Sequence, residues 1–180
     1  KEKITISLSG KTLRNVDSII DNLFIRNRSQ AIEYLIEKKL GDDKTAVILA
    51  TGSAESLRTS KDEYRPTTKI ANLSVIEIAI GNLKDNGFRR IFVVGEQPVL
   101  TSVFSLIGDG KRYGVKIFFV EDKDPPGTAA SLRLLKGELK STFLVLFGDI
   151  IFGKKDIESL WKHQLRHRGI ATLLVTSTSL

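Results

Sequence analysis

Polar and apolar residues alternate strictly over residues 3–8 of this 180-residue chain. A period of two predicts a half-buried β-strand. Its two faces would carry the apolar side chains Ile4, Ile6 and Leu8 and the polar side chains Lys3, Thr5 and Ser7. One isolated strand has open edges on both sides, so this segment is expected to pair with another strand.

Two amphipathic helices are predicted next. The first covers Lys11–Leu23, and the second has Ser29 as its N-cap and Gly41 as its stop. Forty residues with one strand and two short helices cannot bury their apolar faces as a monomer. The segment 1–41 is therefore predicted to form a homodimer or a higher homo-oligomer, followed by a linker at 42–44.

From Thr45 to the end, residues 45–180, short apolar runs alternate with helix-length amphipathic runs. This order predicts βαβ units and an α/β fold with a doubly wound, mostly parallel sheet. The predicted strands are Ala46–Ala50, Ile91–Val94, Val115–Val120, Phe143–Phe147 and Ala171–Val175. The predicted helices are Ser74–Asp85, Val99–Leu106, Thr128–Lys136 and Lys155–His167. Ligands of such sheets bind beyond the carboxyl ends of the strands.

Composition narrows the class of protein. The chain has no cysteine, which excludes disulfides and thiolate metal sites, and no apolar run approaches the roughly 20 residues of a membrane span. We therefore expect a cytoplasmic protein with no membrane partner. The net charge of +7 favours a polyanionic partner such as DNA or nucleotide phosphates.

Residues 2–41 resemble the ribbon-helix-helix family of DNA-binding dimers. The alternating strand, the two helices and the Arg28–Ile32 start of the second helix carry this resemblance. It implies that paired strands enter the major groove of DNA and that helix amides hold a phosphate. The implied base-reading residues are Lys3, Thr5 and Ser7, and the implied phosphate-binding residues are Asn27, Arg28 and Ser29. The alternative is that the segment serves dimerisation only.

Four motifs in residues 45–180 resemble, in order, those of the sugar-1-phosphate nucleotidyltransferases. These are the strand-and-glycine segment Leu49–Arg58, the Pro-Lys-like segment Arg65–Lys69, the Pro-Gly-Thr-Ala segment Pro125–Ala129 and the strand ending in Gly-Asp, Leu144–Asp149. The resemblance covers the N-terminal, nucleotide-binding part of such a domain and implies a Rossmann-like fold of nucleotidyltransferase type A.

This resemblance also implies a division of roles. Lys69 would neutralise phosphate charge, and Asp149 would bind Mg²⁺, a cation that prefers oxygen ligands. The substrates would be an NTP and a sugar-1-phosphate, with pyrophosphate released. The implied nucleotide-binding residues are Leu49, Ala50, Gly52, Ser53, Gly127 and Thr128.

Three residues depart from the family's glycine-rich loop. Ala54, Glu55 and Ser56 stand where that loop has a glycine, a threonine and an arginine. An acidic residue repels a triphosphate, and the lost arginine removes a phosphate clamp, for which Arg58 is the candidate replacement. Two functions follow: an NDP-sugar-forming nucleotidyltransferase with a DNA-binding arm, or a transcription regulator whose degenerate domain senses a nucleotide or nucleotide sugar.

Overall fold

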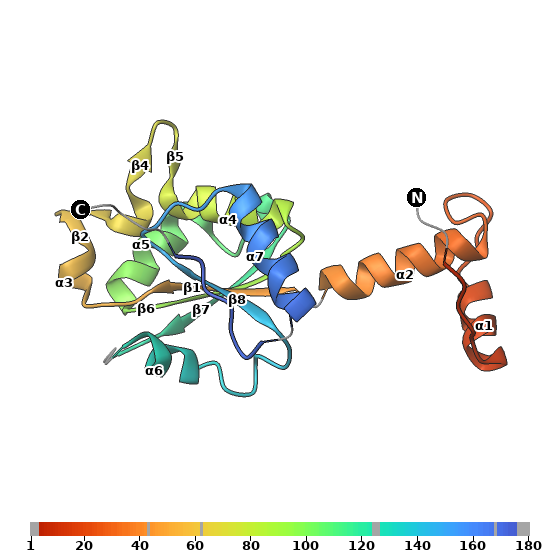
Figure 1. The fold of residues 1–180 in the computed structure, drawn as a ribbon. Helices are drawn as coiled ribbons and strands as arrows, with labels where there is room; N and C mark the ends of the chain where they lie inside the picture. Colours follow the sequence, from red (N-terminus) through yellow and green to blue (C-terminus); the bar gives the residue numbers. More distant parts are fainter. Residues whose placement is uncertain (1–3, 43, 62, 124–126, 168, 176–180) are drawn as a thin grey trace. The chain divides into compact units, whose positions relative to one another are not determined.

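The computed structural model describes residues 4–42, 44–61, 63–123, 127–167 and 169–175 (Figure 1). The chain divides into two compact units, Lys1–Asp42 and Asp43–Leu180. Among the described residues, no helix is both long and apolar enough to span a membrane.

The second unit is built on one parallel sheet of four strands. The strands are β1 (Thr45–Ala50), β6 (Arg90–Gly95), β7 (Lys116–Glu121) and β8 (Phe143–Phe147). They lie in the order β7-β6-β1-β8, and each pairs with its neighbours in parallel. The predicted α/β fold with a parallel sheet is therefore confirmed.

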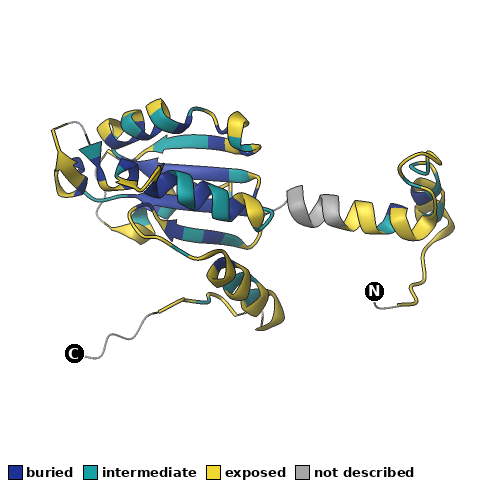
Figure 2. Cartoon of the chain, turned by 90° about the horizontal axis from the view of Figure 1, so that it is seen from above, coloured by how far each residue is buried: buried dark blue, intermediate teal, exposed yellow. Residues whose placement is uncertain are grey.

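Both faces of this sheet are covered. The flanking helices are α4 (Val75–Asp85), α5 (Gln97–Ile107), α6 (Thr128–Arg133) and α7 (Lys154–His167). On one face Ile48 belongs to a large apolar cluster with residues of α4, α5 and α7, whereas Val47 and Leu49 pack with Leu135 on the other. Because both faces are buried, β1 is a continuous apolar run, and in Figure 2 the strands are largely dark blue.

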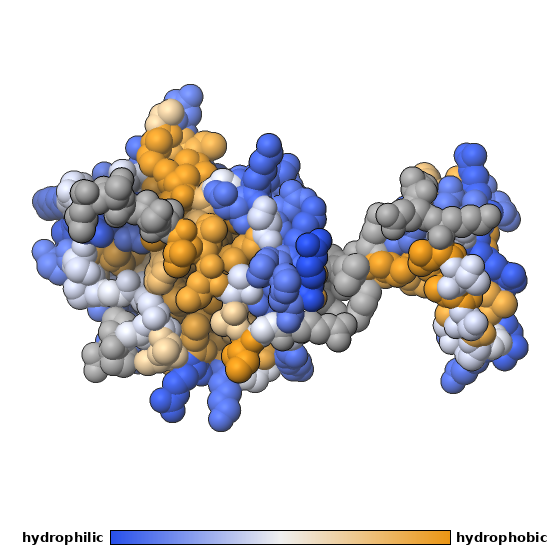
Figure 3. Space-filling model, viewed as in Figure 1, coloured by the Kyte–Doolittle hydropathy of each residue, from blue (hydrophilic) through white to orange (hydrophobic). Residues whose placement is uncertain are grey.

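Small elements fill the connection from β1 to α4. They are α3 (Ala54–Leu57), β2 (Arg58–Ser60), β3 (Glu63–Tyr64), the 3₁₀ helix η1 (Arg65–Thr67), β4 (Lys69–Ile70) and β5 (Leu73–Ser74). A second 3₁₀ helix, η2 (Lys111–Tyr113), precedes β7. The β4–β5 hairpin carries exposed Ile70 and Leu73, and its apolar surface is visible in Figure 3.

Two sequence predictions for this unit are wrong in detail. Ala171–Val175 forms no strand: it does not pair with β8, and Leu173 and Val175 are exposed, whereas the sheet strands are largely buried. The helix predicted over Thr128–Lys136 ends at Arg133 and continues as turns toward Gly137, whose φ of 93° does not fit a helix.

The first unit contains the two predicted helices with different bounds, α1 (Gly10–Asp17) and α2 (Arg28–Asp42). The first ends six residues earlier than predicted because one carboxylate oxygen of Asp21 accepts hydrogen bonds from the amides of Leu23, Phe24 and Ile25. These bonds hold the pKa of the Asp21 carboxyl below its usual value. They stabilise a turn where the pattern predicted continued helix.

The start of α2 and the segment before α1 also differ from the predictions. Asn27 caps α2 instead of Ser29, since its side-chain oxygen accepts from the Gln30 amide at 3.0 Å. The helix continues through Gly41 to Asp42. Residues 4–9 form no strand in the single chain, whose described first unit offers no second strand for pairing.

Candidate nucleotide-binding site

The end of β1 leads into the predicted phosphate-binding loop. Leu49 and Ala50 are buried, and Gly52 has a φ of +119°, a conformation that side chains rarely allow. Ser53 is exposed and caps α3, since its hydroxyl accepts from the Ser56 amide at 3.2 Å. Leu49 and Ala50 therefore belong to the buried end of β1, and Gly52 and Ser53 belong to the loop that follows it.

Two glycines bring the neighbouring strands against the end of β1. Gly95 pairs with Ala50, and a Cβ atom on Gly95 would lie 2.5 Å from the Ala50 carbonyl oxygen. On the other side, the Gly148 amide donates to the Leu49 carbonyl at 2.8 Å. Residues that directly follow β6 and β8 are thereby placed beside the loop that follows β1.

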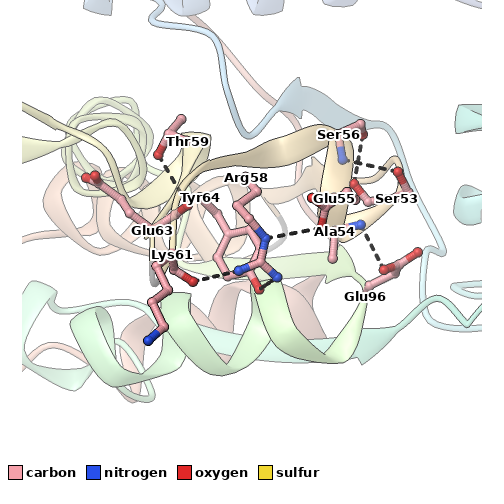
Figure 4. A network of polar contacts seen from close by, with 10 residues as sticks. All are labelled: Ser53, Ala54, Glu55, Ser56, Arg58, Thr59, Lys61, Glu63, Tyr64 and Glu96. Atoms are coloured by element: carbon pink, nitrogen blue, oxygen red, sulfur yellow. Dashed lines mark hydrogen bonds and ion pairs between the residues drawn. The ribbon is translucent and has the colours of Figure 1, made fainter.

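Glu96 is the residue that follows β6, and its carboxylate reaches the loop (Figure 4). Its Oε2 atom accepts a hydrogen bond from the Ala54 amide at 2.8 Å. Glu96 also stands at the N-cap position of α5, but its side chain makes no cap hydrogen bond there. Sequence reasoning missed this contact; the available signal was an acidic residue directly after a buried strand and a glycine.

Arg58, the candidate replacement for the arginine absent from the loop, contacts other groups in this structure. Its guanidinium contacts the Glu55 carboxylate at 3.2 Å and the Tyr64 hydroxyl at 3.4 Å, and it donates to the Lys61 carbonyl at 2.6 Å (Figure 4). These contacts hold the guanidinium within the β2–β3 hairpin. The expectation that Arg58 clamps a phosphate is therefore not supported in this arrangement.

Asp149 lies directly after Gly148, at the carboxyl end of β8. Its Oδ2 atom forms an ion pair with Nη1 of Arg65 at 3.4 Å, joining residues 84 positions apart. The Asp149 side chain is 27% exposed and that of Arg65 is 56% exposed, so solvent reaches both. Sequence reasoning had assigned no role to Arg65.

The donor set limits how a magnesium ion would be held. Among the described residues, no group of three or more His, Cys, Asp or Glu side chains lies close enough to bind a metal ion. Mg²⁺ commonly uses one or two carboxylates together with substrate phosphates. Asp149 fits that arrangement as the single protein carboxylate, provided that its ion pair with Arg65 breaks when the cation binds.

The remaining predicted residues lie at other points of the same unit. Lys69 is exposed at the start of β4, and no described contact joins it to Asp149. Gly127 caps α6 and Thr128 begins it, both exposed, after β7 at the far side of the sheet. The structure thus brings Gly52, Ser53 and Asp149 to neighbouring strand ends, and Lys69, Gly127 and Thr128 make no described contact with them.

A further acidic residue follows β7. Asp122 is 5% exposed, and its Oδ2 atom has no hydrogen-bond partner among the described residues. Its backbone amide donates to the Gly95 carbonyl at 2.9 Å, which places it next to the segment that carries Glu96. The edge of the sheet near the loop is therefore rich in carboxylates.

The candidate DNA-binding residues lie in the first unit. Lys3 lies outside the described residues, and Thr5 and Ser7 are exposed in the irregular segment before α1. The Arg28 guanidinium forms two hydrogen bonds with Asp17, at 2.7 and 2.9 Å, so its side chain is already engaged. Asn27 caps α2 and Ser29 is exposed in its first turn.

Comparison with known proteins defines the class. The model of the nucleotidyl transferase family matches residues 45–179, and this chain belongs to that family.

Two similar proteins illustrate the likeness. The low-salt glycan biosynthesis nucleotidyltransferase Agl11 of Haloferax volcanii is 29% identical over 107 residues, which are 58% of this chain and 30% of that protein. The crystal structure of a "Putative Glucose-1-Phosphate Thymidylyltransferase" from Bacillus anthracis, in complex with a sucrose, matches with a TM-score of 0.58 and 22% identity. That match covers 67% of this chain and 51% of the other, and it concerns the fold alone. The chain thus spans about a third to a half of these relatives.

Proposed function

We propose that the second unit transfers an NMP group from an NTP to a sugar-1-phosphate and releases pyrophosphate. The observation that carries this proposal is the adjacency of the Gly52 loop and Asp149 at the carboxyl ends of β1 and β8, within a chain of the nucleotidyl transferase family. A phosphate oxygen of the sugar-1-phosphate attacks the α-phosphorus, and the bond from that phosphorus to the β-phosphate bridge oxygen breaks. Charge on the phosphate oxygens makes positioning and electrostatics the main demands.

Each residue has a role in this proposal. Amides of the Gly52–Ser53 loop approach the triphosphate, and Lys69 neutralises phosphate charge from its exposed position on β4. Gly127 and Thr128 contact the nucleoside. Asp149 would hold Mg²⁺ together with the phosphates, and the cation would supply charge neutralisation.

A pyrophosphate-release assay on the full chain tests this function. It supplies Mg²⁺ and a matrix of NTPs and sugar-1-phosphates. Release that depends on both substrates identifies them and supports the enzyme. The absence of release with every pair contradicts the proposal.

The second candidate is a regulator that binds a nucleotide or nucleotide sugar without converting it. The Ala54–Glu96 hydrogen bond favours it, since a loop amide that would face a phosphate already has an anionic partner. Nucleotide binding without pyrophosphate release distinguishes this candidate from the enzyme.

For the first unit we propose a homodimer that binds DNA through its N-terminal segment. The described part of this unit leaves many large apolar side chains exposed, and Figure 3 shows apolar surface on it. These are Ile4, Ile6, Leu8, Leu23, Phe24, Leu35 and Ile36. Pairing of residues 3–8 with a second copy would cover part of this surface and place Thr5 and Ser7 on an outer face.

The double substitution Lys3→Ala with Thr5→Ala is expected to weaken specific DNA binding at least about tenfold, because each base contact is worth roughly 1–3 kcal/mol. Duplexes selected from a random pool with the unmodified protein serve as ligands, and fluorescence anisotropy at two salt concentrations measures affinity. Lys123→Ala, an exposed lysine of the second unit, is the matched control. Equal binding by the double variant and the control would assign the segment to dimerisation alone.

A further inference from the structure

The Glu96 carboxylate is bound to a backbone amide of the predicted nucleotide-binding loop. Its Oε2 atom accepts from the Ala54 amide at 2.8 Å, and Ala54 is the third residue of the segment that begins with Gly52 (Figure 4). A carboxylate and a phosphate are both anionic acceptors of amide hydrogen bonds. The Ala54 N–H group cannot donate a full hydrogen bond to the Glu96 carboxylate and to a phosphate at the same time.

The backbone fixes this carboxylate beside the loop. Gly95 pairs with Ala50 in register, and the absence of a side chain on Gly95 allows the two strand ends to meet. Glu96 therefore starts from a rigid position one residue beyond the sheet. Its side chain is partly buried and leaves the N-terminus of its own helix α5 uncapped.

No cation offsets the charge of Glu96 among its described contacts. The buried Asp122 side chain follows the next strand, whereas the Glu55 carboxylate in α3 is paired with Arg58 at 3.2 Å. Arg58, the cation nearest to Glu55 in the chain, is held by the β2–β3 hairpin. Among the described contacts, no Lys or Arg side chain pairs with Glu96.

We propose that the Glu96 carboxylate weakens the binding of phosphate groups to this loop. It acts as an internal anion that a nucleotide's phosphate must displace, and it thereby lowers the affinity of the site for polyphosphates. This inference rests on the proposed nucleotide-binding function of the loop. As a consequence, the unmodified chain binds phosphate ligands only when their concentration is high.

Titration calorimetry with inorganic pyrophosphate in magnesium-free buffer tests the inference on the full chain. Glu96→Gln keeps an oxygen that accepts from the Ala54 amide but removes the charge, and we expect it to bind pyrophosphate about tenfold more tightly. Glu96→Ala frees the amide and is expected to bind at least as tightly as Glu96→Gln. Thermal unfolding of both variants shows whether the fold is retained.

Glu121→Gln is the matched control, because Glu121 is exposed at the end of the neighbouring strand β7 and carries the same charge. Its affinity is expected to stay within about twofold of the unmodified chain, since exposed charges are screened. Equal affinity of the Glu96 variants and the unmodified chain, an equal gain in the control, or no binding by any variant would overturn the inference.

The proposed catalytic function is judged separately by pyrophosphate release from the unmodified chain. Pyrophosphate release by the unmodified chain, without tighter pyrophosphate binding by the Glu96 variants, supports the proposed enzyme activity and rejects the role of Glu96. Tighter binding without release supports the role of Glu96 and rejects the enzyme.

Discussion

Asp149→Asn is expected to reduce pyrophosphate release by about 10²–10³-fold, the effect typical of removing one preorganised charge-stabilising group. The substitution keeps the size of the side chain and removes the charge that would hold a cation against the phosphates. It also removes the anionic partner of Arg65, which lies 3.4 Å away. Initial rates at saturating NTP and sugar-1-phosphate measure the loss.

Asp85→Asn controls for the loss of an exposed carboxylate. Asp85 forms an ion pair with Lys154 at 3.1 Å and its side chain is 52% exposed, so its removal is expected to change rate and stability little. If Asp149→Asn retained the full rate, Asp149 would have no part in catalysis.

Gly95→Ala is expected to destabilise the second unit by about 3 kcal/mol, the cost of forcing an extra group into a packed site. The new Cβ atom would lie 2.5 Å from the Ala50 carbonyl oxygen, a backbone atom that has no freedom to rotate away. The ends of β1 and β6 would have to separate, which also displaces Glu96 from the loop. Chemical denaturation followed by circular dichroism measures the free energy of unfolding.

Gly81→Ala is the control for this substitution. Gly81 lies inside α4, and a Cβ atom there would meet nothing within 4 Å. Alanine favours the helix over glycine by about 1 kcal/mol, so this variant is expected to be more stable than the unmodified chain. A Gly95→Ala variant as stable as the unmodified chain would show that the strand ends can separate without cost.

The sheet was predictable from sequence because its strands are buried on both faces. Val47 and Ile48 face opposite sides of β1, yet both are fully buried, so the run is apolar throughout. The same apolar pattern predicted a strand at Ala171–Val175 that the structure does not contain. Apolar composition gives no information about whether a neighbouring strand is available for hydrogen bonding. The early end of α1 was not predictable, because three hydrogen bonds from backbone amides to the Asp21 carboxylate override the helical pattern.

The candidate site was predictable only in part. The positions of Gly52 and Asp149 follow from strand order, since strand ends of a parallel sheet meet at one edge. The contacts of Glu96 with Ala54 and of Arg65 with Asp149 cross 42 and 84 positions of the chain, and they depend on strand register. Register and side-chain direction are properties of the folded chain that no local pattern encodes.

The close approach of Gly95, Ala50 and Gly148 limits how this site adapts to a ligand. All three residues are buried, and a Cβ atom on either glycine would come within 3.4 Å of Ala50. The carboxyl ends of β6 and β8 are therefore already packed closely against the end of β1. In the proposed nucleotide site, adaptation to a ligand would then fall to the loop at Gly52 and to the side chains of Glu96 and Arg65 rather than to the sheet.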